Sequence, residues 1–263
     1  MPRQSKNLFH RFRTFRRSRL ARKKFARAPR TVRIASVLVF LFTLFALTNF
    51  AYHIIRKPTE LFALAGNTLN KDPTETWRQY SPLFRTHSTS TIPPELLAAL
   101  AQVESSGNPV ARTYWRWRWS FNPLAIYRPA SSAVGLFQMT DPAFAEAARF
   151  CVRNNAVTQT GCGSAFLYVR VIPSHAIELA SVYLDRQVAM VLTLAGDVKA
   201  SAQQKQDLAA FIHLCGAGPA ATFARRKFQM IAGERCGDHL VAGYVARVNA
   251  MKRQFVRLAA EDS

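Results

Sequence analysis

The sequence has few acidic residues and no arrangement of cysteine and histidine that is typical of a metal site. It contains 15 Asp and Glu against 36 Lys and Arg, a formal net charge of +21. Its four cysteines form no C-x-x-C pair and its six histidines do not cluster with them, so we expect no metal and no cofactor. The chain has no internal repeat, and 263 residues suffice for one sizeable core with appendages.

Charge is distributed unevenly along the chain. Met1–Arg33 contains 13 Lys and Arg and no acid, and Ile34–Ile55 is a run of 22 residues without a charge. That run can span a bilayer core of about 30 Å. The basic flank predicts a cytoplasmic N-terminus and a C-terminal part on the opposite side of the membrane. Both segments are too long for a typical cleaved signal peptide, so we predict a retained signal anchor.

The basic arm, residues 1–33, has two candidate partners. Its arginines and lysines could bind nucleic acid, but its position directly before the apolar run favours anionic lipid headgroups, and we expect no nucleic-acid partner. Removing its 13 positive charges from +21 leaves +8 on the remaining residues. That surplus suits the approach to an anionic polymer.

All four cysteines follow the apolar run, in two sequence-local pairs. In an oxidising compartment we expect the disulfides Cys151–Cys162 and Cys215–Cys236, although four cysteines allow three connectivities. Buried free thiols are the alternative if the compartment is less oxidising.

An apolar helix that ends in a carboxylate is predicted over Pro94–Ser105. Proline fits the first turn, apolar residues recur at three- and four-residue spacing, and Gly107 and Pro109 stop the helix. Glu104 then lies in the last turn, where the helix dipole and partial burial are expected to raise the pKa of its carboxyl toward neutrality, as a general acid requires. A surface glutamate that closes a helix is the alternative.

A glycine-led polar loop follows over Ser131–Thr140. Gly135 allows a tight backbone approach, and Gln138 offers a donor and an acceptor beside a pocket. Asp141 and Pro142 then predict an N-cap and a first helical residue. An ordinary turn between two helices is the alternative.

Together these segments resemble a known family. The Glu104-Ser105 pair and the later motif over residues 133–139 resemble the soluble lytic transglycosylase (SLT) family, whose catalytic domain is goose-lysozyme-like. The family motif is of the Gly-Leu-Met-Gln type, and Phe137 replaces its Met here. The resemblance extends from about Ile92 to Phe255.

Two stretches depart from the family pattern. Cys215-Gly216 stand where the family has Tyr-Asn, and Leu240-Val241 stand where it has Glu-Thr. The catalytic signature is therefore specific, whereas the distal sugar-binding signature is degraded.

The resemblance implies a mainly α, lysozyme-like catalytic domain that follows a single N-terminal transmembrane helix. It implies a membrane-anchored peptidoglycan lytic transglycosylase, in which Glu104 protonates the bond between N-acetylmuramic acid and N-acetylglucosamine and then assists closure of a 1,6-anhydro ring. Its partner is the peptidoglycan glycan strand. The substrate-binding residues that it implies are Ser105, Gly135, Gln138, Met139 and Tyr244.

Two other functions stay open. A hydrolytic muramidase would cleave the same bond with water. A catalytically weak wall-binding assembly protein would keep the fold as a scaffold, and the two motif departures support that alternative.

The predicted organisation has four parts: a cytoplasmic arm (1–33), a membrane anchor (34–55), a juxtamembrane connector (56–91) and the catalytic domain (92–263). In the connector we expect a short helix near Glu60–Leu69 and docking on the catalytic domain through aromatic residues: Trp77, Tyr80 and Phe84. In the catalytic domain we expect helices at Pro94–Ser105, Asp141–Arg149, His175–Leu194, Ala202–Leu214, Pro219–Ile231 and Leu240–Leu258.

Tryptophan and arginine alternate strictly over Trp115–Trp119. The alternation predicts a strand or hairpin arm with aromatic residues on one face. The tryptophans could stack on sugar rings or fill a core, and a contact with a membrane surface is a third alternative.

Overall fold

The structure is a computed structural model of the 263-residue chain, and it describes residues 28–57, 60–61, 66–164 and 167–262. The chain forms two compact units, Met1–Arg56 and Lys57–Ser263. Residues 1–27 of the basic arm, and with them most of its predicted contact with lipid headgroups, lie outside the described residues.

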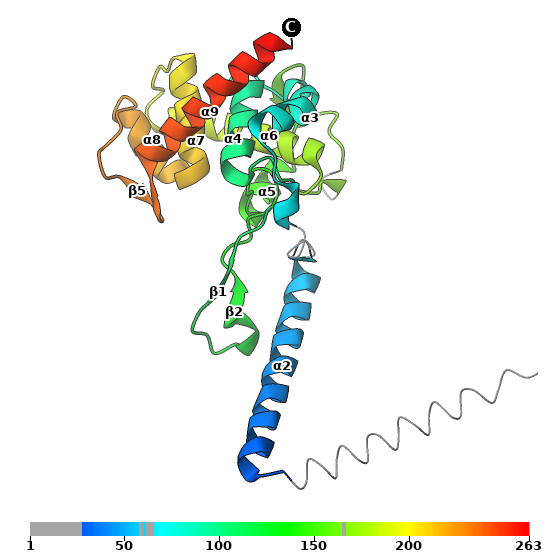
Figure 1. Ribbon diagram of the computed structural model, residues 1–263. Coiled ribbons are helices and arrows are strands. Elements are labelled where there is room, and N and C mark those ends of the chain that lie inside the picture. The colour runs from blue at the N-terminus through cyan, green and yellow to red at the C-terminus, as the bar shows by residue number, and fades with distance from the viewer. Residues whose placement is uncertain (1–27, 58–59, 62–65, 165–166, 263) are drawn as a thin grey trace, which may run out of the picture. The chain divides into compact units, whose positions relative to one another are not determined.

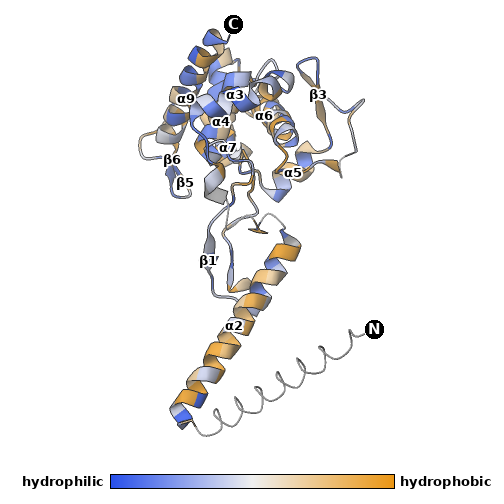
Figure 2. Ribbon diagram, turned by 45° about the vertical axis from the view of Figure 1, so that its right-hand side comes forward, coloured by the Kyte–Doolittle hydropathy of each residue, from blue (hydrophilic) through white to orange (hydrophobic). Residues whose placement is uncertain are grey.

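The described part of the first unit is one long apolar helix, α2 (Arg30–Arg56), drawn in blue in Figure 1. Its 27 residues extend over about 40 Å, more than the roughly 30 Å of a bilayer core. Apolar residues cover it on all sides (Figure 2), unlike the single apolar face of a surface helix. By length and composition, α2 is long and apolar enough to cross a membrane, a criterion that a signal sequence near the N-terminus also meets, and the other described helices do not meet it.

The second unit is mainly helical, as predicted. Its helices are α3 (Pro73–Thr86), α4 (Pro94–Ser105), α5 (Asp141–Ala147), α6 (Pro173–Leu194), α7 (Ala202–Cys215), α8 (Ala217–Arg225) and α9 (Val241–Glu261), with short 3-10 turns η2 (Gly66–Leu69) and η3 (Pro123–Ala125). The bounds of α4 are those predicted from sequence. The α8 helix ends earlier than predicted because Lys227 and Phe228 take left-handed backbone conformations, which fold the Phe228 ring against Phe223.

Three antiparallel two-stranded hairpins decorate the described helices. They pair β1 (Trp115–Trp117) with β2 (Tyr127–Pro129), β3 (Cys151–Arg153) with β4 (Ala156–Thr158), and β5 (Arg235–Cys236) with β6 (His239–Leu240). Asn154 and Asn155 connect β3 to β4 with positive φ angles, a conformation that asparagine tolerates in a two-residue turn. The antiparallel pairing of β1 with β2 confirms the hairpin arm predicted around Trp115.

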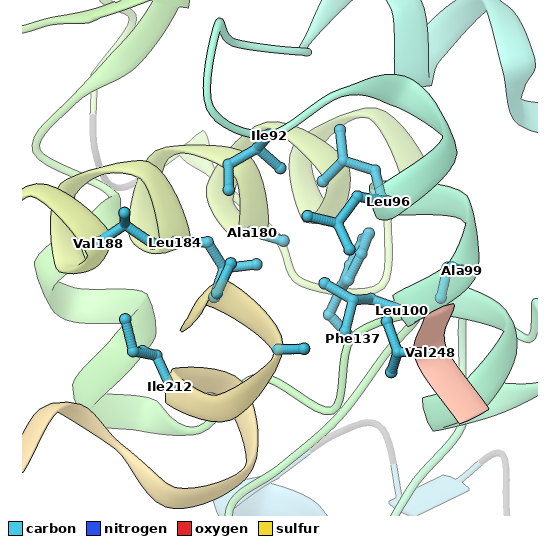
Figure 3. Packing of buried hydrophobic residues seen from close by; sticks show 14 of the residues in the cluster. Ile92, Leu96, Ala99, Leu100, Phe137, Ala180, Leu184, Val188, Ile212 and Val248 are labelled. Carbon is cyan, nitrogen blue, oxygen red and sulfur yellow. The ribbon is translucent and has the colours of Figure 1, made fainter. Parts of the chain in front are cut away.

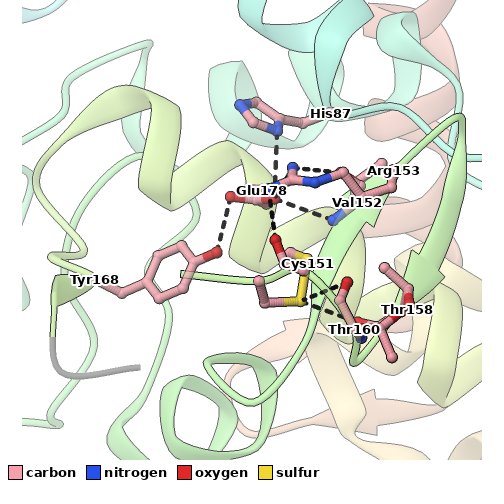
Figure 4. Close-up of a disulfide and its surroundings, with 10 residues drawn as sticks. His87, Cys151, Val152, Arg153, Thr158, Thr160, Tyr168 and Glu178 are labelled. Atoms are coloured by element: carbon pink, nitrogen blue, oxygen red, sulfur yellow. Dashed lines mark hydrogen bonds and ion pairs between the residues drawn. A yellow bond between two sulfur atoms is a disulfide. The ribbon is translucent and has the colours of Figure 1, made fainter. Parts of the chain in front are cut away.

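Both predicted disulfides are present. Cys151–Cys162 closes the β3–β4 hairpin beside α6 (Figure 4), and Cys215–Cys236 joins the end of α7 to β5. The β3 strand is further fixed by Glu178 of α6, whose carboxylate accepts hydrogen bonds from the Val152 backbone N–H and the Tyr168 hydroxyl, each at 3.0 Å. Burial and the Glu178 carboxylate raise the pKa of Tyr168 to about 12.

The core of the second unit surrounds α4, whose residues 96–101 are all buried. Figure 3 shows Leu96 and Leu100 of α4 packed beside Phe137 from the polar loop and Val248 of α9, with Ala180 and Leu184 of α6 close by. An apolar helix buried on every side has one fixed orientation, and this orientation determines where its last turn emerges.

The segment treated as a connector contributes to this core. Helix α3 was not predicted, yet Trp77, Tyr80 and Phe84 on it are buried in the core. The Trp77 indole N–H also donates to the Asp262 carboxylate at 2.7 Å, which ties α3 to the C-terminus of α9. Residues from Lys57 onward thus lie in the same compact unit as the catalytic segment.

The prediction that Asp141 is an N-cap is wrong. Thr140 holds the N-cap position, and the Asp141 carboxylate pairs with the Arg170 guanidinium at 2.6 Å. Arg170 also donates to the Met139 carbonyl at 2.7 Å, so it holds the end of the polar loop against the segment before α6.

If α3 is an integral part of the core, Phe84→Ala will lower the free energy of unfolding by about 3–5 kcal/mol, because it leaves a cavity around a fully buried ring. Chemical denaturation of the full chain in detergent measures this change. Phe121→Ala, at a fully exposed ring, is the matched control and should change stability by less than about 0.5 kcal/mol. Equal effects of the two substitutions would contradict the packing of α3.

Candidate active site

Glu104 lies in the last turn of α4, where the helix leaves the core. The helix ends there because Ser106 and Gly107 take left-handed conformations and donate their backbone N–H groups back to carbonyls in the preceding turn. The predicted position of Glu104 at a helix terminus is therefore correct.

The Glu104 side chain is 19% exposed and lines a hollow of about 390 Å³. Most of the wall is polar, from Asn70, Asn108, Arg112 and Thr113 among others. A polar hollow of this size suits a ligand rich in hydroxyl and amide groups.

Two side chains from distant parts of the sequence reach the Glu104 carboxylate. The Tyr244 hydroxyl of α9 donates a hydrogen bond to Oε1 at 2.5 Å, and Nε2 of His213 in α7 lies 3.5 Å from the same oxygen. Both contacts are made to Oε1, so the carboxylate is held at one oxygen.

His213 lines a second hollow of about 220 Å³. The lining of this hollow also includes Gln138, Met139, Tyr183 and Gly216. Because His213 contacts the carboxylate that lines the first hollow, the Glu104–His213 pair links the linings of the two hollows.

The electrostatic surroundings of Glu104 differ from the prediction. Burial raises the pKa of Glu104, but the His213 imidazole, the Tyr244 hydrogen bond and the charge of His239 all lower it, and together they outweigh burial. The pKa therefore lies below the ordinary carboxyl value, and the expectation of a raised pKa is wrong. The helix terminus and burial, which are visible in the sequence, both favour a raised pKa of Glu104. The groups that lower this pKa come from distant segments: α7, α9 and β6.

Tyr244 responds in the opposite direction. Burial and the neighbouring Glu104 carboxylate raise the pKa of Tyr244 well above its usual value. Tyr244 therefore keeps its proton and remains a hydrogen-bond donor to Glu104 across the physiological pH range.

Ser105 connects α4 to the polar loop instead of contacting the carboxylate. Its buried hydroxyl lies 2.8 Å from the Ala101 carbonyl and 2.9 Å from the Leu136 carbonyl, so it can donate its proton to either one. In the described part of the chain, the hydrogen-bond and ion-pair partners of the Glu104 carboxylate are Tyr244 and His213.

The polar loop is held by Gly135 and Gln138. Gly135 has a φ of +83°, and a Cβ there would collide with the Arg170 backbone carbonyl. The Gln138 side-chain amide donates to the carbonyls of Ala111 and Gly135 at 3.0 Å each, and Gln138 itself has a left-handed φ of 45°. Met139 is 7% exposed and forms part of the wall of the second hollow.

Glu104 is the one carboxylate among the described residues that line either hollow. Glu146, which lies one turn into α5, accepts a hydrogen bond from Gln187 at 2.8 Å. Asp141 is paired with Arg170, and Glu178 is occupied by the contacts at β3. The site therefore presents a single carboxylate with a phenol and an imidazole.

The Cys215–Cys236 disulfide holds both histidines of the site. Cys215 lies two residues after His213, and Cys236 pairs in the β5–β6 register with His239. The bridge thus joins the two segments from which imidazoles act on Glu104.

The fold and site define a helical domain with one half-buried carboxylate at the end of its central helix. Residues 81–202 match the family model described as Transglycosylase SLT domain, and the chain therefore contains an SLT domain. This domain indicates a transglycosylase-type enzyme that acts on peptidoglycan. A search of curated proteins found no match.

His213 was not predicted from the sequence as a site residue. It follows the buried run Leu208–Ile212 of α7 and precedes Cys215-Gly216, the first departure from the family pattern. A titratable side chain at the end of a buried helix, beside an altered motif, could have indicated His213 as a site residue. The family match ends before both His213 and Tyr244.

Gly135→Ala should lower the free energy of unfolding by about 1–3 kcal/mol, because it combines a left-handed φ with a collision against backbone. Thermal unfolding monitored by circular dichroism measures the loss. Gly163→Ala is the matched control, since a Cβ there meets no atom within 4 Å. A stable Gly135→Ala variant would contradict the geometry of the polar loop.

Proposed function

We propose that this protein is a membrane-anchored peptidoglycan lytic transglycosylase and that Glu104 is its catalytic acid and base. The observation that carries the proposal is the position of Glu104, at the end of a buried helix, facing a polar hollow within an SLT domain. The substrate is the β-1,4 bond between N-acetylmuramic acid and N-acetylglucosamine.

The reaction needs one group that first gives and then takes a proton. Glu104 protonates the bridging oxygen as the bond from the muramyl C1 breaks, and the substrate's acetamido group assists the departing charge. The carboxylate then accepts the proton of the muramyl C6 hydroxyl as the bond from O6 to C1 forms. No water is consumed, and the product carries a 1,6-anhydro ring. The presence of a single carboxylate in the described lining supports this route over one that needs two.

Glu104 must be protonated at the first step although its surroundings lower its pKa. A saccharide in the hollow removes the remaining contact of the carboxylate with water, and desolvation favours the neutral acid. Substrate binding therefore raises the pKa of Glu104 at the stage where the proton is needed.

Tyr244 and His213 act as positioning residues. Both contact Oε1, so we assign Oε2 to the saccharide oxygen. Ser105 links α4 to the polar loop, and Gly135 lets this loop approach the Arg170 backbone closely. Gln138 and Met139 form the wall to which we assign the second sugar.

For location, we propose that α2 is a retained anchor in the bacterial inner membrane, with the catalytic unit in the periplasm. The 13 basic residues before the apolar run support a cytoplasmic N-terminus. Two disulfides in the second unit support an oxidising compartment.

Glu104→Gln will lower the rate of peptidoglycan digestion by about 10²–10⁴-fold, because an amide cannot donate the proton. The full chain is incubated with purified sacculi, and the released muropeptides are analysed by mass spectrometry. Glu95→Gln, at the start of the same helix, is the matched control and should retain activity.

The masses of the products separate the alternatives. Anhydro-muramyl ends support the proposal, and reducing ends released by the unaltered chain would instead identify a hydrolase. Undiminished digestion by Glu104→Gln would show that this residue is not the acid, and no digestion by the unaltered chain would identify a scaffold protein.

His213→Gln will raise the pKa of Glu104, because it removes the group that lowers this pKa most strongly. Titration of ¹³C-labelled glutamate carboxyls by NMR, with Glu104→Gln to assign the signal, measures the direction. His239→Gln should give a smaller shift of the same sign, since its charge is the weakest of these influences. An unchanged or lowered pKa in His213→Gln would contradict the assigned electrostatics.

A further inference from the structure

The proposed reaction leaves one prominent feature of the second unit unused. We define the tryptophan hairpin as residues 114–130, which contain β1, η3 and β2. It projects from the helical body of the unit (Figure 1). Backbone hydrogen bonds from Ala130 to Tyr114 and from Arg118 to Ile126 close it into an arm whose tip is residues 119–125.

Aromatic rings are fully exposed at the tip. Trp119 and Phe121 have no cover from the rest of the described chain, and Trp117 is 63% exposed. The alternative in which these tryptophans fill a core therefore does not hold for Trp117 and Trp119. The ring centroids of Trp115 and Trp117 lie 5.2 and 4.6 Å from that of Tyr127, so aromatic contacts stabilise the stem of the arm. At the tip, Trp119 and Phe121 remain exposed.

All charged residues of the tryptophan hairpin are basic. Arg116, Arg118 and Arg128 lie within it, and residues 105–140 include no Asp or Glu. Exposed indole rings beside guanidinium groups match the headgroup region of an anionic bilayer, where tryptophan prefers the interface and arginine pairs with phosphate.

The base of the hairpin is fixed to the residues that follow α2. The Trp115 indole donates to the buried Glu60 carboxylate at 2.7 Å, and Arg112 pairs with it at 3.1 Å. Lys57 pairs with Glu60 at 3.2 Å and donates to the Ala133 carbonyl at 3.0 Å. Lys57 is the first residue of the second unit and follows Arg56, the last residue of α2, in the sequence, so the hairpin root is held to the start of the second unit.

We propose that the tryptophan hairpin is a second membrane contact, in which Trp119 and Phe121 enter the headgroup region of the bilayer and the arginines bind anionic lipid phosphates. The inference rests on the proposed role of α2 as an anchor. Tyr114 at the root lines the hollow beside Glu104, whereas the tip residues line neither hollow, which disfavours contact between the tip and a glycan bound at Glu104. Together with α2, the contact would give the catalytic unit two points of attachment.

Quenching of tryptophan fluorescence by brominated lipid tests the contact. The full chain is reconstituted in nanodiscs that contain phosphatidylglycerol and phosphatidylcholine, with or without bromine on the acyl chains. The difference in emission between the unaltered chain and Trp119→Phe reports Trp119, and bromine should reduce this difference about two-fold or more if the ring lies at the interface. Arg116→Gln with Arg118→Gln should weaken the quenching, and nanodiscs of phosphatidylcholine alone should do the same.

Separate readouts distinguish failure of the hairpin from failure of the anchor. Flotation with phosphatidylcholine vesicles in high salt tests α2, and a chain that does not float overturns the anchor and this inference with it. A chain that floats without bromine quenching of Trp119 overturns the hairpin contact alone. Two outcomes would identify the hairpin as a glycan-binding surface and would also overturn the proposed contact with the bilayer. In the first, the quenching is lost when muropeptide oligosaccharides are added. In the second, the Trp119 emission responds to these sugars and not to bromine. Trp119→Phe should still digest sacculi, since Trp119 does not line either hollow.

Discussion

The site depends on the complete burial of α4, which fixes the direction in which its last turn emerges. With residues 96–101 enclosed by α3, α6, α9 and the polar loop, the last turn of α4, which carries Glu104, cannot be redirected without unpacking the core. The Tyr244 hydrogen bond then joins the end of α4 to α9, the helix that packs along it. Position and protonation of the carboxylate thus follow from one packing arrangement.

The electrostatics of Glu104 combine two opposing demands. Histidine and tyrosine favour the carboxylate form, which the second half of the proposed reaction uses as a base. Burial favours the neutral acid, which the first half of the reaction requires. This effect of burial becomes stronger when a saccharide displaces water from the carboxylate. A single group can then serve both steps, because the first step removes its proton and leaves the carboxylate form that the histidine and tyrosine favour.

Local signals in the sequence predicted much of the fold. The prolines and glycine around α4 gave its bounds and the place of Glu104, and short spacing between cysteines gave both disulfides. Contacts between distant segments were not accessible in this way. His213 and Tyr244 approach Glu104 only after α7 and α9 pack, so the direction of the pKa shift was predicted wrongly. Helix α3 was missed because the polar residues between its buried rings, and the internal Pro82, obscure its apolar face.

The most direct measurement of the central claim is a crystal structure of the full chain with a bound muramyl oligosaccharide. The bridging oxygen should lie within about 2.6–3.2 Å of Glu104 Oε2, with Tyr244 still bonded to Oε1. A saccharide that binds away from this carboxylate, or a Glu104 side chain turned out of the hollow, would contradict the account.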